Sequence, residues 1–268
     1  MRIKMLFMLA SLPVILLAAG IVESQKLDCN INDRNDRLVL LNKALSTDDA
    51  PCVKRILDTG VDPNGLIAEL SGTAPILIAS ELGNVEILEA LFNAGVRRAD
   101  PATLAAFFAL IQKKNLPGVK VFLKAGVPVD LKDEYGGTPL MAAASLGVQD
   151  IAKYLLENGA NPNAKTVKGT TILMSASKGV GDDPELLMLL LKAGAKIDAV
   201  SKDRRNAAFF ALEFSNLRKL EYLLRSGIDS SLTDLKGRTL KELAEEIMDP
   251  STKSEALELI ERFKNPKP

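Results

Sequence analysis

A glycine that recurs at intervals of about 33 residues constrains this chain more than any other feature of its sequence. The positions seven, four and three residues before each of these glycines carry apolar side chains. This i, i+3, i+4 spacing makes one apolar face of a helix, and glycine suits the left-handed residue at a helix C-terminus. Repeats of this length predict a solenoid, because each unit buries its apolar face against its neighbours. The glycines are Gly60, Gly95, Gly126, Gly159, Gly194 and Gly227.

Each unit is predicted to contain a further helix ahead of this one. Residues Thr138 and Pro139 place a Thr cap before a Pro at the first helical position, which is the chemistry of a helix start. The hexapeptide Ala-Ala-Phe-Phe-Ala-Leu occurs at 105–110 and again at 207–212, in register with the repeat. Aromatic residues are only 4% of the chain and hydrophobic residues 47%, a balance that favours Ala- and Leu-rich helices over a β-sandwich. The chain is therefore predicted to be all-α.

The unit from Gly137-Thr138-Pro139-Leu140 to Gly159-Ala160-Asn161-Pro162-Asn163-Ala164 resembles the ankyrin-repeat consensus over its whole length. The resemblance covers roughly residues 34–264. It implies an ankyrin-repeat solenoid of helix-turn-helix units with hairpin-like tips, forming a single domain over 36–264. About seven units are expected, of which the first and last are degenerate caps. Residues 249–253 are expected to break the last unit before a final amphipathic helix, and 265–268 to form a disordered tail.

The sequence departs from the family at one position of the first helix. The His that usually follows Thr-Pro-Leu is replaced by apolar residues, and the chain contains no His at all. The hydrogen bonds that this His normally makes to the inter-repeat turns must be absent, so these turns are expected to be either softer or packed by apolar contacts. The replacements are Leu77, Phe107, Met141, Met174 and Phe209.

The N-terminus has the layout of a secretory signal peptide. Arg2 and Lys4 precede an apolar run over 5–19, and small residues follow it. The run is shorter than the roughly 20 residues that span a bilayer, so a retained membrane anchor is the weaker interpretation. We expect residues 1–24 to be the signal peptide, with cleavage after Gly20 or Ser24, and 25–35 to form an N-terminal extension. The mature chain is then periplasmic or secreted.

The only two cysteines are Cys29 and Cys52. In an oxidising compartment an even number of cysteines predicts a disulfide, which here would tie the extension over the end of the stack. The alternative is that both are small buried hydrophobes.

Few residues in the chain point to catalysis. Without His, neither a Ser-His-Asp nor a Cys-His arrangement can form, and the commonest metal ligand is missing. Ser175 and Lys178 match a Ser-x-x-Lys motif, but its companion motifs are absent, and Ser175 falls where the repeat usually packs. The segment 179–184 hints at a phosphate loop, but a short insertion is the better interpretation, with Asp183 capping the next helix and Pro184 opening it. We therefore expect no enzyme activity, no cofactor and no metal site.

Partners of ankyrin proteins most often lie on the concave surface that the hairpin tips and the first helices form, and register transfers that surface to this chain. Several of its residues are apolar where the family is usually exposed, as expected of a protein-binding face. The alternative is that some of them pack against adjacent tips. By contrast, Phe107, Phe108, Phe209 and Phe210 are expected in the core. The predicted partner-binding residues are Leu82, Ile111, Gln112, Glu134, Tyr135, Leu146, Val167, Lys168, Lys178, Lys202, Glu213, Phe214 and Leu235.

The leading hypothesis is a periplasmic, non-enzymatic scaffold that sequesters, inhibits or protects one protein partner. The exported bacterial ankyrin proteins that this chain resembles include antidotes against peptidoglycan-cleaving enzymes, which favours a cell-wall hydrolase as partner, and accessory proteins of periplasmic catalases. A further alternative is a secreted effector that binds a host protein. The chain has 34 basic residues (Lys and Arg) and 34 acidic ones (Asp and Glu). It therefore has no net charge to attract nucleic acid or, after signal cleavage, a membrane. The free chain is expected to be a monomer.

Overall fold

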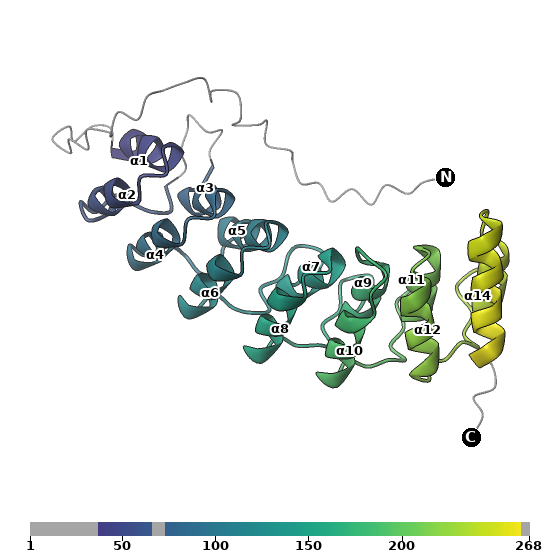
Figure 1. Cartoon of the computed structure of the whole chain (residues 1–268). Coiled ribbons are helices and arrows are strands. Elements are labelled where there is room, and N and C mark those ends of the chain that lie inside the picture. The colour runs from purple at the N-terminus through teal and green to yellow at the C-terminus, as the bar shows by residue number, and fades with distance from the viewer. Residues whose placement is uncertain (1–36, 66–72, 264–268) are drawn as a thin grey trace.

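A computed structural model describes residues 37–65 and 73–263 of the chain, and the part described is built from seven pairs of antiparallel helices (Figure 1). The signal peptide, the extension with Cys29 and the tail at 265–268 lie outside the described residues, so these predictions stay predictions. The pairs are α1 (Arg37–Ser46) and α2 (Ala50–Leu57); α3 (Pro75–Leu82) and α4 (Val85–Asn93); α5 (Pro101–Gln112) and α6 (Leu116–Lys124); α7 (Pro139–Leu146) and α8 (Gln149–Glu157); α9 (Ile172–Lys178) and α10 (Glu185–Lys192); α11 (Ala207–Glu213) and α12 (Leu217–Arg225); α13 (Leu240–Glu245) and α14 (Pro250–Phe263).

The pairs stack side by side into a two-layer solenoid (Figure 1). The first helices form one layer, in which α3, α5, α7, α9, α11 and α13 each contact the next. The second helices form the other layer, with α2, α4, α6 and α8 in successive contact and α12 packed on α14. We number the units one to seven from the N-terminus. Within the described ranges the structure contains no strand, and an isolated bridge joins Lys165 to Thr171. This confirms the all-α solenoid.

The recurring glycines end the second helices as the sequence predicts. All six have positive φ, from 83° at Gly60 to 103° at Gly95. The N–H of Gly95 donates to the carbonyl of Phe92, and the next N–H, of Val96, donates to Leu91. This pairing satisfies carbonyls that the helix end leaves without a partner.

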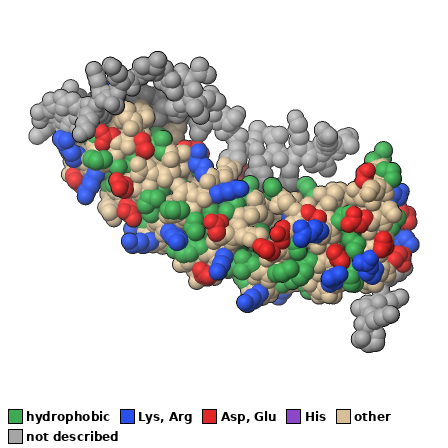
Figure 2. Space-filling model, in the orientation of Figure 1, with side chains coloured by type: hydrophobic (Ala, Val, Ile, Leu, Met, Phe, Trp, Pro, Cys, Tyr) green, Lys and Arg blue, Asp and Glu red, His purple; other side chains and the backbone are tan. Residues whose placement is uncertain are grey.

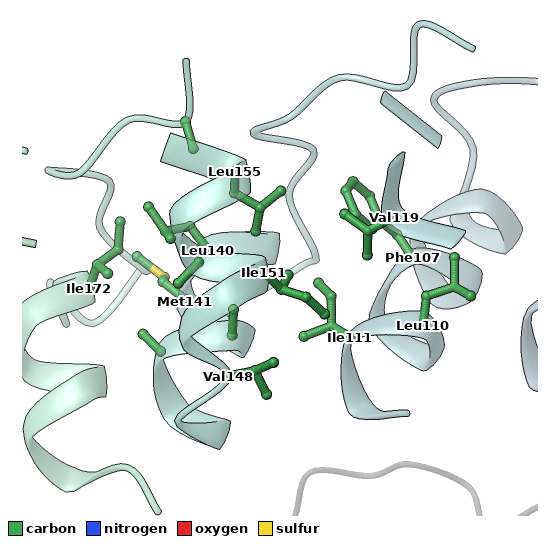
Figure 3. Packing of buried hydrophobic residues seen from close by; sticks show 14 of the residues in the cluster. Phe107, Leu110, Ile111, Val119, Leu140, Met141, Val148, Ile151, Leu155 and Ile172 are labelled. Carbon is green, nitrogen blue, oxygen red and sulfur yellow. The ribbon is translucent and has the colours of Figure 1, made fainter. Parts of the chain in front are cut away.

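The apolar face before each glycine forms the core between the layers. Residues such as Val53, Leu88 and Leu187 are fully buried. At the position three before the glycine, Leu123, Leu156 and Leu191 are only partly buried and pack against this core. Figure 3 shows the same kind of packing around Val119 and Leu155. The core is therefore one continuous apolar layer along the solenoid, not a separate centre in each unit.

Apolar packing replaces the missing His at the starts of the first helices. Phe107, Met174 and Phe209 are fully buried at that position, and Met141 is nearly so, whereas Leu77 is partly buried. The Thr cap remains, since Thr171 Oγ1 accepts from the backbone N of Met174 at 3.3 Å. In return, the Met174 sulfur accepts from the backbone N of Thr171 at 3.4 Å. Of the two outcomes expected for these turns, the structure shows the apolar one.

Polar side chains four residues after the recurring glycines join one unit to the next. Asn163 Oδ1 accepts from the backbone N of Lys196 at 2.9 Å, and its amide donates to the Gly194 carbonyl at 2.9 Å. Asn64 makes the equivalent pair of bonds to Arg97 and Gly95. These side chains satisfy backbone groups of the neighbouring unit, which fixes the spacing of the units along the stack.

The segment 179–184 is an insertion between α9 and α10, as predicted. The Asp183 carboxylate accepts from the backbone N of Glu185, and Pro184 directly precedes α10. The last unit differs from the prediction in one detail, because the break between α13 and α14 falls at 246–249. Pro250 to Lys253 instead form the first turn of α14, where the Asp249 carboxylate accepts from Thr252 N.

Two further observations bear on the sequence predictions. Cys52 is buried on α2, but its predicted partner Cys29 lies outside the described residues, so the disulfide stays a prediction. Among the helices that the structure describes, none is both long and apolar enough to cross a bilayer.

Candidate partner-binding surface

Four hairpin-like tips precede α7, α9, α11 and α13, and each is a tight turn closed by backbone hydrogen bonds. In the first, Asp133 N donates to the Gly137 carbonyl at 3.0 Å and Gly136 N donates to the Asp133 carbonyl at 3.0 Å. The Asp133 carboxylate also accepts from the backbone N of Tyr135 and Gly137. The same turn bonds recur at residues 166–170, 201–205 and 234–238. The tips are therefore built alike, with a polar residue at the start of each.

The tips of units four, five and six are also hydrogen-bonded to one another. Val167 N donates to the Tyr135 carbonyl at 2.8 Å, and Lys202 N donates to the Lys168 carbonyl at 3.0 Å. Glycine permits this approach, since a Cβ at Gly136 would lie 3.2 Å from Thr166 Cα and one at Gly169 3.1 Å from Lys202 N. The side chains on these three tips are thus held in a fixed register.

The predicted tip residues point largely into solvent, and we call them the tip row. Tyr135 is 63% exposed and Leu235 66%, and Val167 is also exposed. Single exposed apolar residues are common, but Tyr135 and Val167 lie on tips that are bonded to each other, and grouped apolar side chains point to a contact surface. The full tip row is Glu134, Tyr135, Val167, Lys168, Lys202 and Leu235.

The remaining predicted residues form a second row, at the C-terminal ends of the first helices. Leu82 and Phe214 are exposed there, whereas Leu146 is half-buried and packs against the core. Because α7 has eight residues at about 1.5 Å each, this helix-end row lies roughly 12 Å from the tip row. The structure therefore divides the predicted surface into two parallel rows. The helix-end row is Leu82, Gln112, Leu146, Lys178, Glu213 and Phe214.

Ile111 is the one predicted partner residue that belongs to neither row. It is 0% exposed, so its prediction as a partner-binding residue is wrong. Ile111 follows Phe107 by one helical turn and shares its buried face. Figure 3 shows Ile111 pointing from α5 toward Val148 and Ile151 of the next unit. Of the four aromatics expected in the core, Phe107 and Phe209 are fully buried, while Phe108 and Phe210 pack on it partly exposed.

Charged residues lie in and beside the helix-end row in units five and six. Arg205 Nη2 lies 2.6 Å from Glu213 Oε2, and the Arg205 guanidinium lies 5.0 Å from the centre of the Phe210 ring. Burial of Lys178 lowers the pKa of its ammonium, and the positive charge of Lys168 acts in the same direction, while Glu213 partly opposes them. An anionic group of a partner placed near such a lysine would stabilise its charged form.

The unit-seven tip contains a similar arrangement, to which the buried carboxylate of Asp234 is added. Burial alone would raise the pKa of Asp234, but hydrogen bonds from the Arg238 guanidinium and from backbone N–H groups lower this pKa overall. The Arg238 guanidinium also pairs with Glu246 at 2.5 Å. Arg238 and Glu246 repeat the Arg205 and Glu213 pair one unit later, so salt bridges brace the concave side of the last two units.

Sequence reasoning missed several exposed residues. Val180, in the insertion, and Met248, before α14, are strongly exposed apolar side chains, and Arg204 has φ of +58°. Tip alignment could have identified Arg204, because the other three tips carry glycine at its position. A shallow groove of about 280 Å³ also lies between the ends of α11 and α13. It is lined by Leu212, Glu213, Ser215, Leu243, Glu246 and Ile247.

The residues considered for catalysis do not form a reactive site. Ser175 is 4% exposed on α9, so its hydroxyl is not presented to a substrate. In the described ranges, no three His, Cys, Asp or Glu side chains are grouped so as to hold a metal ion. The face in Figure 2 shows Lys and Arg interspersed with Asp and Glu, and apolar side chains between them. A mixed surface of this kind suits contact with another protein better than with a polyanion.

Comparison with known proteins agrees with this architecture. Residues 105–201 match the family model for ankyrin repeats, in three copies. A solved structure of the ankyrin repeat domain of Bcl-3, a member of the IkappaB protein family, superposes with a TM-score of 0.67 at 20% identity. The match covers 83% of this chain and 97% of that one. The fold is therefore the ankyrin-repeat solenoid, a fold that typically binds other proteins.

Curated relatives share this repeat over part of their length. The human SH3 and multiple ankyrin repeat domains protein 2 is 28% identical over 70% of this chain and 8% of its own length. Human protein phosphatase 1 regulatory subunit 27 is 41% identical over 26% of this chain and 45% of its own. The phosphocholine transferase AnkX of Legionella pneumophila is 25% identical over 77% of this chain and 24% of its own. The chain thus spans less than half the length of each of these relatives.

Proposed function

We propose that this ankyrin-repeat solenoid is a binding scaffold that engages one protein partner through the tip row and the helix-end row. The observation that carries the proposal is the set of exposed apolar side chains on the hydrogen-bonded tips, above all Tyr135 and Val167. A few residues supply most of the energy of a protein interface, and tyrosine is one of the residue types enriched among them. Because the backbone bonds already fix these groups, binding orders little additional structure.

In its finer form, the proposal is that the mature chain works in the periplasm as an antidote against a cell-wall hydrolase. The layout of residues 1–24 as a signal peptide supports the location. The resemblance to exported ankyrin antidotes supports the role. A rigid curved face can cover an active-site cleft without a moving part. The scaffold itself needs no catalytic group for this.

A second candidate is a secreted effector that binds a host protein. The similarity to a Legionella pneumophila protein, over 77% of this chain, favours it. The two candidates differ in where the mature protein accumulates and in the source of its partner. A role as accessory protein of a periplasmic catalase is a third form of the same binding function.

The test is a pull-down from the cell envelope with the full-length chain, alongside Tyr135→Ala and Phe214→Ser. Both side chains are exposed, so the variants should keep the unfolding midpoint of the wild type. We expect a stoichiometric envelope protein to be recovered with the wild type and lost with Tyr135→Ala. If that protein is a peptidoglycan-cleaving enzyme, adding the purified chain should stop its cleavage of isolated cell walls.

Three outcomes decide between the candidates. Recovery of one envelope protein whose binding both variants leave intact would overturn the proposed surface. Recovery of a catalase, without inhibition of wall cleavage, would select the accessory role. Cell fractionation that finds the mature chain in the culture medium or the host cytosol would select the effector.

A further inference from the structure

The tips of units five and six carry a concentration of positive charge that the neighbouring tips lack. Lys165, Lys168, Lys202 and Arg204 are all exposed there, and Asp203 is the one carboxylate within 165–169 and 201–205. The unit-four tip has Asp133 and Glu134 beside Lys132, and the unit-seven tip has Asp234 beside Lys236 and Arg238. We call Lys165, Lys168, Lys202 and Arg204 the basic tip cluster.

Backbone contacts hold the basic tip cluster together. The hydrogen bond from Lys202 N to the Lys168 carbonyl is 3.0 Å long, so the two lysines project from adjacent tips whose backbones are directly bonded. Like charges placed this close repel one another, and holding them there costs folding free energy. The positive charge of Lys168 also acts on Lys178, on α9. Burial is the main cause of the lowered pKa of Lys178, Glu213 opposes it, and Lys168 lowers the pKa further. Cations held together against their repulsion favour an anionic partner.

The backbone of Arg204 gives a second and independent observation. Its φ is +58°, in the left-handed region, while the corresponding residues of the other three tips are Gly136, Gly169 and Gly237 with φ from 75° to 79°. A residue with a Cβ is strained in this region and glycine is not. Arg204 N nevertheless makes the same turn bond, to the Ser201 carbonyl at 3.0 Å. Among the four tips, only unit six therefore carries a side chain, the Arg204 guanidinium, at the position where glycine would be more stable. Asp48, Lys114 and Ser215 outside the tips also have positive φ, so the strain supports a role for Arg204 only together with the charge of the cluster.

We propose that the basic tip cluster is the recognition site for an acidic segment of the protein partner. This inference rests on the proposed function and names the chemistry of one part of its surface. Val167 lies between Lys165 and Lys168 on the unit-five tip, and Tyr135 lies on the adjoining tip bonded to it, so the segment should carry apolar side chains beside its carboxylates. Arg204 is the residue to which a carboxylate can bind with two hydrogen bonds, whereas the lysines act as point charges.

A protein segment fits this site better than a nucleic acid or a lipid surface. The whole chain has equal numbers of basic and acidic residues, so it has no net charge to attract an extended polyanion. The cluster occupies two adjacent tips and is flanked by Glu134 on one side and Asp234 on the other. Such a short basic stretch between acidic groups matches a few carboxylates in a row.

The test measures binding of a short fluorescein-labelled peptide of Glu, Asp and Phe residues to the full-length protein by fluorescence anisotropy. The same peptide with Gln and Asn in place of the acids is the control. We expect the acidic peptide to bind at least about tenfold more tightly and to lose this advantage as salt is raised. Lys168→Gln and Lys202→Gln should each weaken it, while Lys192→Gln, an exposed position on the outer layer, should have no effect.

Two further variants make the proposal sharper. Asp203→Asn removes the one carboxylate that lies among the residues of the basic tip cluster, so it should tighten binding of the acidic peptide. Arg204→Gly removes a cation and relieves the backbone, so it should weaken binding while the thermal unfolding midpoint stays the same or rises. A loss of binding without a loss of stability separates recognition from folding.

The inference is overturned if the amide peptide binds equally well, or if Asp203→Asn and Arg204→Gly leave the affinity for the acidic peptide unchanged. It is also overturned if phosphatidylglycerol vesicles or a thymidine oligonucleotide bind more tightly than the peptide with the same response to the variants. Once a natural partner is known, the cluster variants should weaken its binding too. A partner that depends on Tyr135 but not on the cluster would leave the proposed function standing and remove this inference.

Discussion

The side-chain nitrogen of Lys219, on α12, lies 2.9 Å from the backbone carbonyl oxygen of Ala176, on α9 of the preceding unit. It also donates to the Gly179 carbonyl at 3.1 Å, and the residue is only 3% exposed. The Asp182 carboxylate in turn accepts from the backbone N of Arg218 and Lys219. The insertion of unit five and the second helix of unit six therefore hold each other in place.

Replacing Lys219 should reveal how much this contact contributes. Lys219→Met removes the shorter of two bonds to each carbonyl, leaving those from Gly179 N and the Asn216 amide, and should lower the free energy of unfolding by about 1 to 3 kcal/mol. The measurement is urea unfolding at neutral pH. The exposed Arg218→Met is the control, because its backbone N makes the bond to Asp182 and is retained. An equal effect of both variants would contradict the proposed contact.

The difference in stability between the wild type and Lys219→Met should increase with pH. Burial lowers the pKa of Lys219 below its ordinary value of 10.5, although Asp182 and Asp183 oppose this. Between the lowered pKa and 10.5 the unfolded chain binds more protons than the folded chain, so the stability contributed by Lys219 rises with pH. The neutral amine still has two N–H groups for the two carbonyls. The advantage of the wild type over Lys219→Met should therefore grow from neutral pH toward 10, and a constant difference would contradict this account.

The close approach of the tips predicts unequal effects of two glycine substitutions. Gly169 and Gly237 have φ of +76° and +75°, so an alanine at either should cost about 1 to 2 kcal/mol. At Gly169 the new Cβ would also lie 3.1 Å from Lys202 N, whereas nothing lies within 4 Å at Gly237. Gly169→Ala should therefore destabilise more than Gly237→Ala, and only the former should weaken partner binding. Thermal unfolding compares the two.

The side-chain bonds between units should contribute measurably to stability. Asn163→Ala removes the acceptor for Lys196 N and the donor for the Gly194 carbonyl, so it should cost about 1 to 3 kcal/mol. Asn158→Ala is the matched control, because its amide bonds only to Tyr154 in its own helix. Hydrogen exchange at Lys196 should accelerate in the first variant. Unchanged protection there would show that the bond does not couple the units.

The aromatic contact between units two and three gives a large expected effect. Phe122 on α6 is fully buried. Its ring packs edge-on against that of Phe92, with 4.9 Å between ring centres, and at a tilt against that of Phe107, with 5.4 Å between ring centres. Phe122→Ala should lower the free energy of unfolding by about 3 to 5 kcal/mol. The exposed Phe214→Ala should change it by less than about 0.5 kcal/mol. Denaturant titration of both proteins separates a core phenylalanine from a surface one.

The fold could be predicted from the sequence because it depends on local patterns repeated many times. Glycines such as Gly95, with the apolar positions before them, define a helix end by spacing alone. The burial of Ile111 was also within reach, because it stands four residues after Phe107 on the same helix face. Position in the repeat alone places Ile111 on the surface, since the equivalent Ser145 is half-buried, but the larger isoleucine side chain reaches the core of the next unit.

The candidate surface was less predictable, because it depends on contacts between units. Register alone placed Tyr135 and Phe214 on one strip, and it could not show that they occupy separate rows at opposite ends of the first helices. The bond from Lys202 N to the Lys168 carbonyl joins residues 34 positions apart, so no local pattern reveals it. The same holds for the contact of Lys219 with Ala176, at a sequence separation of 43.

Repeat arrays evolve by gaining and losing whole units, and the Asp182 contact restricts where this can happen here. Asp182 belongs to unit five, but the helix start that it caps belongs to unit six. A unit inserted between them, or the loss of either one, would leave a buried lysine and a helix end without their partners. Losing either unit therefore removes the buried lysine's partners as well as the polar bonds that recur at other junctions, which favours inheritance of units five and six as a pair.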